Sequence, residues 1–339
     1  MNRCLRIIFL VFLVFTGGSA SAQQATVAFY NVENLFDTQD DSLKQDEEFL
    51  PYGVRGWTPT RLKTKYHNIY KVIAGLGDIG QPPALIGLAE VENRVVLEGL
   101  LRHTPLHRRR YQIVHEESPD QRGIDVALLY DPAQFQYLSH EAVPVDLGSL
   151  SDRPTRDILY VRGVLFGSDT VHCFINHWPS RYGGVSSSAP RRQRAAEVLQ
   201  TRIRALQQEC PDALIIITGD FNDGPTEASM RTLTESTDAG SPLTNISQYA
   251  CAGTHKYQGE WSTFDQFIVT ANLLNGNRLR VKDGQAQCYR PDWLVEEDVK
   301  QLGFRPKRTY VGYQYQGGFS DHWPVYLQLL PRKVEVAEK

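Results

Sequence analysis

The chain has 339 residues, of which 41% are hydrophobic and 22% charged, an ordinary composition for a folded globular protein. Its formal net charge is −3 at pH 7, which excludes the strong overall basicity of proteins that hold nucleic acid through net charge alone. No low-complexity tract, repeat or Pro/Gly/Ser-rich linker divides the sequence, so we expect one large domain.

The N-terminus has the three-part pattern of a secretory signal peptide. Arg3 and Arg6 precede an apolar run at residues 7–15, and small residues follow up to Ala22. The apolar run is too short to span a bilayer as a helix, and a buried first helix or an anchor is the weaker alternative. We therefore expect cleavage after Ala22, export to the periplasm or the extracellular space, and no stable membrane insertion.

Short runs of apolar, β-branched or aromatic residues predict strands. They lie at Thr26–Tyr30, Ala84–Leu88, Ile124–Tyr130, Tyr160–Leu165, Val171–Asn176, Leu214–Thr218, Gln266–Thr270 and Pro324–Leu330. Helical patterns lie between some of them, at Thr60–Leu76, Arg94–Arg102, Ala189–Gln208 and Glu227–Glu235. Strands interleaved with helices predict an α/β fold with a mixed sheet core.

The segment Gly75–Gly80 matches the G-x-G-x-x-G pattern of dinucleotide-binding loops. Such a loop needs its glycines between a strand and a helix. These glycines instead follow a helical pattern and precede Pro82-Pro83, so we interpret them as a helix end and a turn.

Four cysteines remain after the expected cleavage, and their spacing is irregular, without a C-x-x-C pair. A zinc site built on cysteines is therefore not expected. A disulfide between Cys251 and Cys288 is one alternative for an exported chain, and two free thiols are the other.

Polar residues follow four of the predicted strands, and another group precedes the last strand. They are Asn31-Val-Glu33-Asn34, Glu90-Val-Glu92-Asn93, Asn176-His177-Trp-Pro-Ser-Arg181, Asp220-Phe-Asn222-Asp223 and, before the last strand, Asp321-His322. Singly, these residues have structural explanations, since Asp and Asn beside Gly commonly make turns and a lone His is often a satisfied interior residue. Together they supply oxygen ligands for a magnesium-like ion and imidazoles for proton transfer, the mixture that phosphate-ester hydrolysis needs.

The ordered motifs YNVENLF, LAEVEN, RGID, NHWPSR, GDFND, FDQF and SDHWP resemble those of the endonuclease/exonuclease/phosphatase superfamily over residues 25–330. The resemblance implies a four-layer α/β sandwich, in which two packed mixed β-sheets are flanked by helices and the site lies at one sheet edge. Residues 1–22 are then the signal peptide, 23–332 the catalytic domain and 333–339 a flexible tail.

The resemblance also implies roles for individual residues. Asn31, Glu90 and Asp321 correspond to metal-binding positions, with Asn31 either a ligand or an orienting neighbour. Asp220 corresponds to the carboxylate that orients or deprotonates the attacking water, and Asn222 to the amide that holds the nucleophile or a phosphate oxygen. The remaining roles fall to His322 as a catalytic histidine, to Asp265 as the acid that fixes its tautomer, and to His177 as a phosphate contact that protonates the leaving oxygen.

The chain departs from the family pattern at two positions. Glu33 stands where many relatives have Asp, which leaves its role as a ligand open, and Ala89 stands where many have Gln before the metal-binding Glu. Arg181 and Arg194 are our candidates for phosphate binding, because a guanidinium can hold phosphate through two hydrogen bonds. For Arg191, Arg192 and Arg194, a solvated helix face is the alternative.

The expected activity is hydrolysis of phosphodiester bonds, as in nucleases, by metal-assisted attack of water with Mg²⁺ or Mn²⁺ as cofactor. The expected partner is a phosphate ester, with DNA and RNA among the candidates, and nothing in the sequence indicates an oligomer. Two alternatives stay open: a phosphomonoesterase acting on inositol phosphates or other small phosphates, and a non-catalytic binding protein on the same scaffold.

Overall fold

The computed structural model describes residues 24–77, 81–235 and 241–331. The predicted signal peptide, residues 1–22, and the predicted tail, residues 333–339, lie outside the described residues. None of the helices in the described part of the chain has the length and apolar character that a bilayer crossing requires.

The larger strands are Ala25–Leu35 (β1), Leu85–Val91 (β2), Gln112–His115 (β3), Asp125–Tyr130 (β4), Phe135–Val143 (β5), Ile158–Leu165 (β6), Asp169–His177 (β7), Leu214–Asp220 (β8), Asp265–Thr270 (β12) and Val325–Leu330 (β19). The short strands are Leu243–Asn245 (β9), His255–Tyr257 (β10), Glu260–Ser262 (β11), Arg280–Val281 (β13), Gln287–Cys288 (β14), Val295–Glu297 (β15), Phe304–Pro306 (β16), Tyr310–Val311 (β17) and Gln314–Tyr315 (β18). The helices are Pro59–Gly75 (α1), Arg94–His103 (α2), Val185–Glu209 (α3), Ala228–Thr234 (α4) and Asn272–Asn275 (α5).

Two mixed sheets form the centre of the fold. One has the strand order β13-β19-β1-β2-β4-β3, with β14 also paired to β19, and the other has the order β5-β6-β7-β8-β12-β9. β1 and β2 are parallel, as are β7 and β8, while β19 and β12 run antiparallel to β1 and β8. The carboxyl ends of four central strands and the amino ends of two others therefore lie at one edge of the sandwich.

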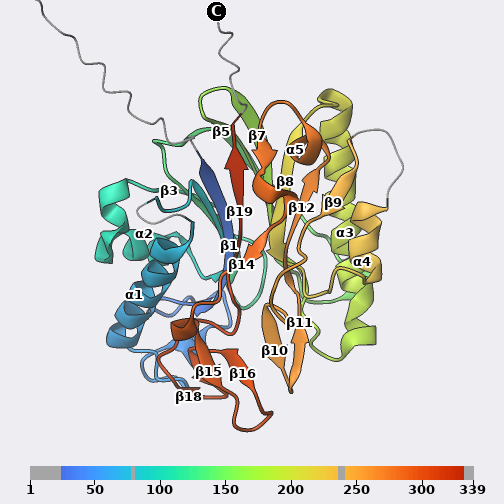
Figure 1. Cartoon of the computed structure of the whole chain (residues 1–339). Coiled ribbons are helices and arrows are strands. Elements are labelled where there is room, and N and C mark those ends of the chain that lie inside the picture. The colour runs from blue at the N-terminus through green and yellow to red at the C-terminus, as the bar shows by residue number, and fades with distance from the viewer. Residues whose placement is uncertain (1–23, 78–80, 236–240, 332–339) are drawn as a thin grey trace, which may run out of the picture.

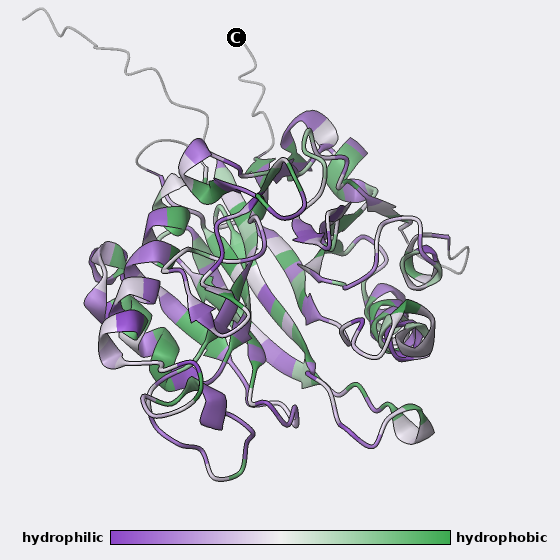
Figure 2. Cartoon of the chain, turned by 90° about the horizontal axis from the view of Figure 1, so that it is seen from below, coloured by the Kyte–Doolittle hydropathy of each residue, from purple (hydrophilic) through white to green (hydrophobic). Residues whose placement is uncertain are grey.

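The layers follow the order helix, sheet, sheet, helix (Figure 1). Apolar side chains of both sheets interdigitate in one core, which includes Phe29, Ile175 and Phe267. A second core lies between the first sheet and helices α1 and α2, and a third between the second sheet and helices α3 and α4. In Figure 2 hydrophobic residues are frequent in the central strands, whereas the outer helices alternate between hydrophilic and hydrophobic residues. The four-layer sandwich implied by the sequence motifs is confirmed.

All the strands and helices predicted from apolar patterning are present, with ends that differ by a few residues. Among the larger strands, β3 and β5 were not predicted from the sequence. β5 lies at the edge of its sheet, and only Phe135 and Val143 at its two ends are buried, so its sequence carries little apolar alternation. The helix end predicted at Gly75 is confirmed, and Gly77 has the left-handed φ of +83° that a turn after a helix favours. Residues 78–80 lie outside the described residues.

Cys251 and Cys288 are free thiols in this structure, and the Cys251 side chain hydrogen-bonds to Cys288. The disulfide between them stays one of two alternatives. Cys173 is buried in the core between the sheets, as its apolar surroundings in the sequence indicated.

The prediction of a solvated helix face is wrong for Arg192. Its side chain is completely buried, with Nε 2.6 Å from Asp223 Oδ1 and Nη1 2.8 Å from Ser188 Oγ. Asp223 also accepts a hydrogen bond of 2.6 Å from Ser229. This ion pair attaches helix α3 to the loop that follows β8, because burial forces each charge to keep its partner.

Arg192→Ala should lower the free energy of unfolding by about 3 kcal/mol, the lower end of the cost of breaking a buried pair, because Asp223 keeps its contacts with Arg181 and Ser229. The exposed Arg194 on the same helix supplies the control, since Arg194→Ala should change stability by no more than about 0.5 kcal/mol. Urea unfolding of both variants checks this. Equal losses in the two variants would contradict the role assigned to the buried pair.

Candidate active site

Three neighbouring strands place titratable side chains at the same level of the second sheet. Asp220 ends β8 and is the register partner of His177 at the end of β7 and of Asp265 at the start of β12. Directly opposite residues on neighbouring strands share a face of the sheet. The register alone therefore groups these three side chains, which are all buried.

Two facing irregularities shape the edge of the first sheet. The β1 register with β2 shifts between Asn31 and Leu35, and the β2 register with β4 shifts around Glu90. Glu33, Asn34 and Glu90 all have positive φ, at 53°, 56° and 62°. Bulges of this kind redirect side chains and recur beside active sites. Here they let the Asn34 backbone N–H donate to Glu90 Oε2 at 2.9 Å.

Asp220 joins the two halves of the site. Asn31 Nδ2 donates to Asp220 Oδ2 at 3.0 Å, and the Nε2 atoms of His322 and His177 lie 3.7 and 3.8 Å from the same oxygen. Burial raises the pKa of Asp220 to about 6, although His322 opposes the shift. A carboxylate with that pKa can accept a proton near neutral pH.

His322 is held by a buried hydrogen bond between its Nδ1 and Asp265 Oδ2, 2.7 Å long. Burial alone would lower its pKa, but the carboxylates of Asp265 and Asp220 raise the pKa well above the ordinary value. The imidazolium is thus the stable form of His322 at neutral pH. Its Nε2 faces Asp220, so any proton it carries there points into the site.

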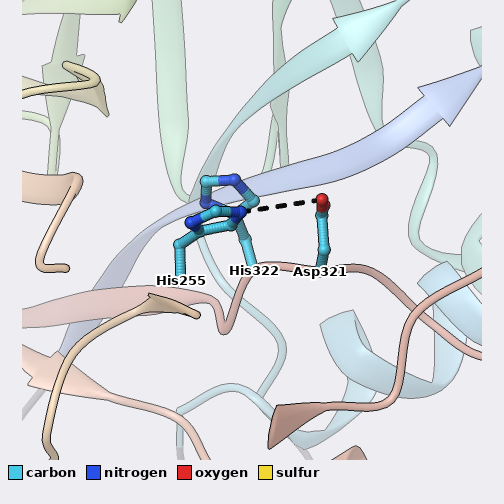
Figure 3. Close-up of side chains that lie close together, drawn as sticks. All are labelled: His255, Asp321 and His322. Atoms are coloured by element: carbon cyan, nitrogen blue, oxygen red, sulfur yellow. Dashed lines mark ion pairs between the residues drawn. The ribbon is translucent and has the colours of Figure 1, made fainter. Parts of the chain in front are cut away.

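His255 lies against His322 and was not identified from the sequence. The two rings are 4.6 Å apart at 35°, and His255 Nε2 is 3.8 Å from Asp321 Oδ2 (Figure 3). Burial and the neighbouring His322 lower the pKa of His255 to about 3, so this ring is neutral. It lies at the start of a three-residue strand, a context that carries no strand-end motif.

A second group of charges surrounds Asp321. Arg308 Nη2 is 2.6 Å from Asp321 Oδ2, and Arg308 Nε is 3.8 Å from Glu33 Oε1. Despite burial, Arg308 and neighbouring histidines lower the pKa of Asp321 to about 2. Burial and the nearby Asp321 raise the pKa of Glu33 to about 7, and burial lowers that of Lys65 to about 8.

Glu33 is tied into the backbone. It accepts hydrogen bonds from the backbone N–H groups of Thr309 and Tyr310, at 2.6 and 3.3 Å. The same segment is fixed from the other side by Lys65, whose Nζ donates to Thr309 Oγ1 and to the carbonyl of Phe319. In this arrangement Glu33 positions the 308–310 segment, and with it Arg308, beside Asp321.

His177 is neutral in this structure, because burial and then Arg156 lower its pKa well below the ordinary value. Its Nε2 lies 3.9 Å from Glu90 Oε1 as well as near Asp220. Arg156 donates from Nε to the carbonyl of His177 at 3.2 Å and from Nη2 to that of Trp178 at 2.6 Å. Arg156, which the sequence did not single out, therefore fixes the backbone that carries His177.

The remaining candidates have structural partners. Asn222, at φ +52°, donates from Nδ2 to the Trp178 carbonyl at 3.1 Å. Arg181 donates to the Asn222 carbonyl at 2.8 Å and pairs with Glu227 at 2.7 Å, so it braces the loop after β8. Arg194 is exposed and donates to the carbonyl of Asp146 at 3.0 Å, a contact that does not join it to the group around Asp220.

Two clusters of His, Asp and Glu among the described residues have ligand atoms within 4.8 Å of one another. They are His255, Asp321 and His322, and His115, Glu117 and Asp125. In the first, Asp321 is already paired with Arg308 and His322 with Asp265. Glu90 Oε1 and Asp220 Oδ2 lie 3.4 and 3.0 Å from Asn31 Nδ2, so carboxylate oxygens without thiolates gather here, the ligand type that suits Mg²⁺ or Mn²⁺.

Asn31 presents its two amide atoms to different partners. Its Oδ1 accepts from the Glu33 backbone N–H at 3.0 Å, and its Nδ2 donates toward Glu90 and Asp220. Of the two roles implied by the sequence motifs, this arrangement matches that of an orienting neighbour.

Comparisons with known proteins agree with this geometry. A sequence model described as "Endonuclease/Exonuclease/phosphatase family" matches residues 26–331. No curated protein matches the chain. Solved structures share the fold at low identity.

One of these structures is an endonuclease/exonuclease/phosphatase family protein from Bacteroides thetaiotaomicron, with 16% identity and a TM-score of 0.58 over 93% of this chain and 100% of that one. Another is the mannosyl-6-phosphatase of the same organism, with 16% identity and a TM-score of 0.56 over 90% and 99% of the two chains. The human Nocturnin catalytic domain, with bound sulfate, is similar at 14% identity and a TM-score of 0.55 over 90% and 94%.

Asp265→Asn should lower the pKa of His322 toward its ordinary value of about 6.5, because burial is then opposed only by the weaker effects of Asp220 and Asp321. A raised histidine pKa stabilises the fold below the unfolded value, and that contribution is lost as pH rises through the folded pKa. The variant should therefore lose most stability near pH 6 and below.

Ring NMR titration of His322 checks this shift. His172, whose pKa burial lowers to about 4, serves as the internal reference and should not move. An unchanged His322 titration in Asp265→Asn would show that this pair does not set its charge.

Proposed function

The chain belongs to the endonuclease/exonuclease/phosphatase family, whose hydrolases act on phosphate esters, and we propose that it is an exported Mg²⁺- or Mn²⁺-dependent enzyme that hydrolyses phosphodiester bonds. The observation that carries the proposal is the convergence of Asn31, His177 and His322 on one buried oxygen of Asp220. Strand register, two bulges and a buried His–Asp pair are all needed to produce it.

In the proposed mechanism Asp220 orients the attacking water and accepts its proton, for which its raised pKa is suited. Asn31 holds the carboxylate in place through its amide nitrogen. His322, kept cationic by Asp265, donates from Nε2 to a non-bridging phosphate oxygen where charge grows in the transition state.

The divalent ion would be held by Glu90 and Asp321, with Asn31 as ligand or neighbour. Such an ion would supply Lewis-acid polarisation of the phosphate and offset the charge that develops on its oxygens. Glu90 is the better of the two carboxylates, because Asp321 is already compensated by Arg308. A bound cation would also offset the effect of Asp321, which adds to that of burial in raising the pKa of Glu33.

His177 fits a phosphate contact better than a proton donor in the resting protein. A neutral imidazole can donate one hydrogen bond, but it supplies no extra proton to the leaving oxygen. A bound phosphate anion would raise its pKa, so protonation on substrate binding is the route by which it acts as the acid.

Measurements of activity distinguish this proposal from two alternatives. A phosphomonoesterase would use the same Asp220 and His322 chemistry on a terminal phosphate. A non-catalytic binding protein does not account for the positive φ of Glu33, Asn34, Glu90 and Asn222, each of which strains the backbone at the site.

Excess chelator should abolish hydrolysis of bis-p-nitrophenyl phosphate, and added Mg²⁺ or Mn²⁺ should restore it, because in the proposed mechanism the ion stabilises the charge that develops on the phosphate oxygens. Glu90→Gln should weaken Mn²⁺ binding at least tenfold, measured by electron paramagnetic resonance, whereas Glu98→Gln on the exposed face of α2 should not. Full turnover in excess chelator contradicts the metal requirement. Nicking of supercoiled plasmid supports a nuclease, and activity confined to monoesters supports the phosphatase.

His322→Ala and Asp220→Asn should each lower kcat by several orders of magnitude while the protein stays folded. His177→Ala should cost less on nitrophenyl esters, whose leaving group is already acidic, than on unactivated esters. Turnover of each variant on both substrate types, with melting temperature as the folding control, checks this. Equal costs of His177→Ala on both types would leave it a phosphate contact only, and near-normal activity of folded His322→Ala would refute the site.

A further inference from the structure

A cavity of about 350 Å³ opens beside the candidate active site. It lies between the 120–122 loop, the segment before β6 and the start of helix α3, and its wall includes Pro179 and Ser180, which directly follow His177 and Trp178. Arg156 forms part of the wall and donates to the carbonyls of those two residues. The cavity and the group around Asp220 thus share one stretch of backbone.

The cavity lining carries a strong excess of positive charge. Arg122, Arg153, Arg156 and Arg191 line it, against the single carboxylate of Asp120. That carboxylate is already engaged, with one oxygen 3.1 Å from Arg156 Nη1 and the other 3.7 Å from Arg122 Nε. Little negative charge in the lining is therefore left for Arg153 and Arg191.

Two polar groups of the lining lack partners within the described residues. The side chain of Thr155 is buried, with only 3% of the residue exposed, and its hydroxyl makes no hydrogen bond. The Arg153 guanidinium is exposed, and no hydrogen bond or ion pair joins it to another described side chain. A buried hydroxyl without a partner is costly, and a neighbouring guanidinium without one is a ready donor to an anion.

We propose that this cavity is a subsite for a second phosphate group carried by the same substrate, next to the phosphate ester that is cleaved. The proposal rests on the proposed function and narrows it to substrates with at least two phosphate groups. Arg153, Arg122 and the Thr155 hydroxyl hold the second phosphate. Arg156 couples the two sites, because it lines the cavity and positions the backbone of His177.

The size of the cavity suits one phosphate with part of a sugar, and an exposed Tyr182 ring stands at its rim. A nucleotide chain supplies a second phosphate beside an aromatic base, which stacks on such rings. A small bisphosphorylated molecule supplies the same charge without the base. Binding of an anion in this cavity does not require a positive net charge of the whole chain, because only the arginines of the lining contact the anion.

The test compares two chromogenic substrates that differ only in the second phosphate. They are thymidine 5′-(p-nitrophenyl phosphate) with a free 3′-hydroxyl and the same compound with a 3′-phosphate. The wild-type enzyme should favour the 3′-phosphorylated compound in kcat/KM by roughly tenfold or more, the worth of one charged hydrogen bond. Arg153→Ala should reduce this ratio through KM, with kcat and the rate on the 3′-hydroxyl compound unchanged.

Matched variants separate the subsite from general charge effects. Arg280→Ala, at the opposite end of the first sheet where β13 pairs with the end of β19, should leave the ratio unchanged. Thr155→Val keeps the shape of the side chain, removes the hydroxyl, and should reduce the ratio without lowering the melting temperature. A ratio that stays at the wild-type value in Arg153→Ala, Arg122→Ala and Thr155→Val overturns the proposal.

Direct binding distinguishes failure of the subsite from failure of the proposed function. Calorimetry should show that thymidine 3′,5′-bisphosphate binds more tightly than thymidine 5′-phosphate, and that Arg153→Ala removes the difference. If this holds while wild-type protein with metal hydrolyses neither ester, the function is wrong and the subsite stands. Competition with inositol 1,4-bisphosphate identifies the class of molecule that carries the second phosphate. If this compound competes as well as the nucleotide and the competition depends on Arg153, the substrate is a small phosphorylated molecule. If Tyr182→Ala removes the preference for the nucleotide, the substrate is a nucleotide chain. Equal affinity of wild type for the mono- and bisphosphate overturns the subsite.

Discussion

The carboxylate of Asp220 is the point at which the two sheets and the candidate chemistry meet. It stands at the end of a central strand, buried between register partners on both sides, and it accepts a hydrogen bond from Asn31 of the other sheet. A shift of β8 by one residue would turn Asp220 to the opposite face of the sheet. The packing of Phe29, Ile175 and Phe267 between the sheets therefore also fixes the distance between the two halves of the site.

Burying so many acids at one sheet edge costs free energy unless each gains a partner. The structure supplies partners from remote segments: Arg308 for Asp321, His322 for Asp265, and backbone N–H groups of 309–310 for Glu33. These partners do not fully offset the cost of burial at Glu33 and Asp220, whose pKa values remain raised. The raised pKa, caused mainly by burial, allows Asp220 to accept a proton near neutral pH, so the cost of burying this acid and its proposed role in catalysis have the same origin.

The sequence predicted the parts of this arrangement that depend on local pattern. Apolar runs identified the central strands, and polar residues directly after them identified Asp220, His177 and Glu90, because a strand end places its side chains without help from distant segments. His255, Arg308 and Lys65 could not be identified that way. Their positions depend on how the 255–262 hairpin and the 304–319 segment fold back on the sheet edge, and neither segment has strong apolar alternation.

Arginine shows the limit of local pattern most clearly. On helix α3, Arg191, Arg192 and Arg194 look alike in the sequence, yet Arg192 is buried on Asp223, Arg191 lines the cavity beside His177, and Arg194 contacts only the Asp146 carbonyl at the surface. Their different surroundings follow from the helical turn of about 100° per residue, which points adjacent side chains to different neighbours. Arg181, which pattern alone assigns to phosphate, is used to brace the loop that carries Asn222. Of the cavity arginines, Arg122 and Arg156 pair with Asp120 and Arg191 donates to the Tyr182 carbonyl, whereas Arg153 has no side-chain partner among the described residues. The proposed subsite is therefore centred on Arg153 and not on the motif residue Arg181.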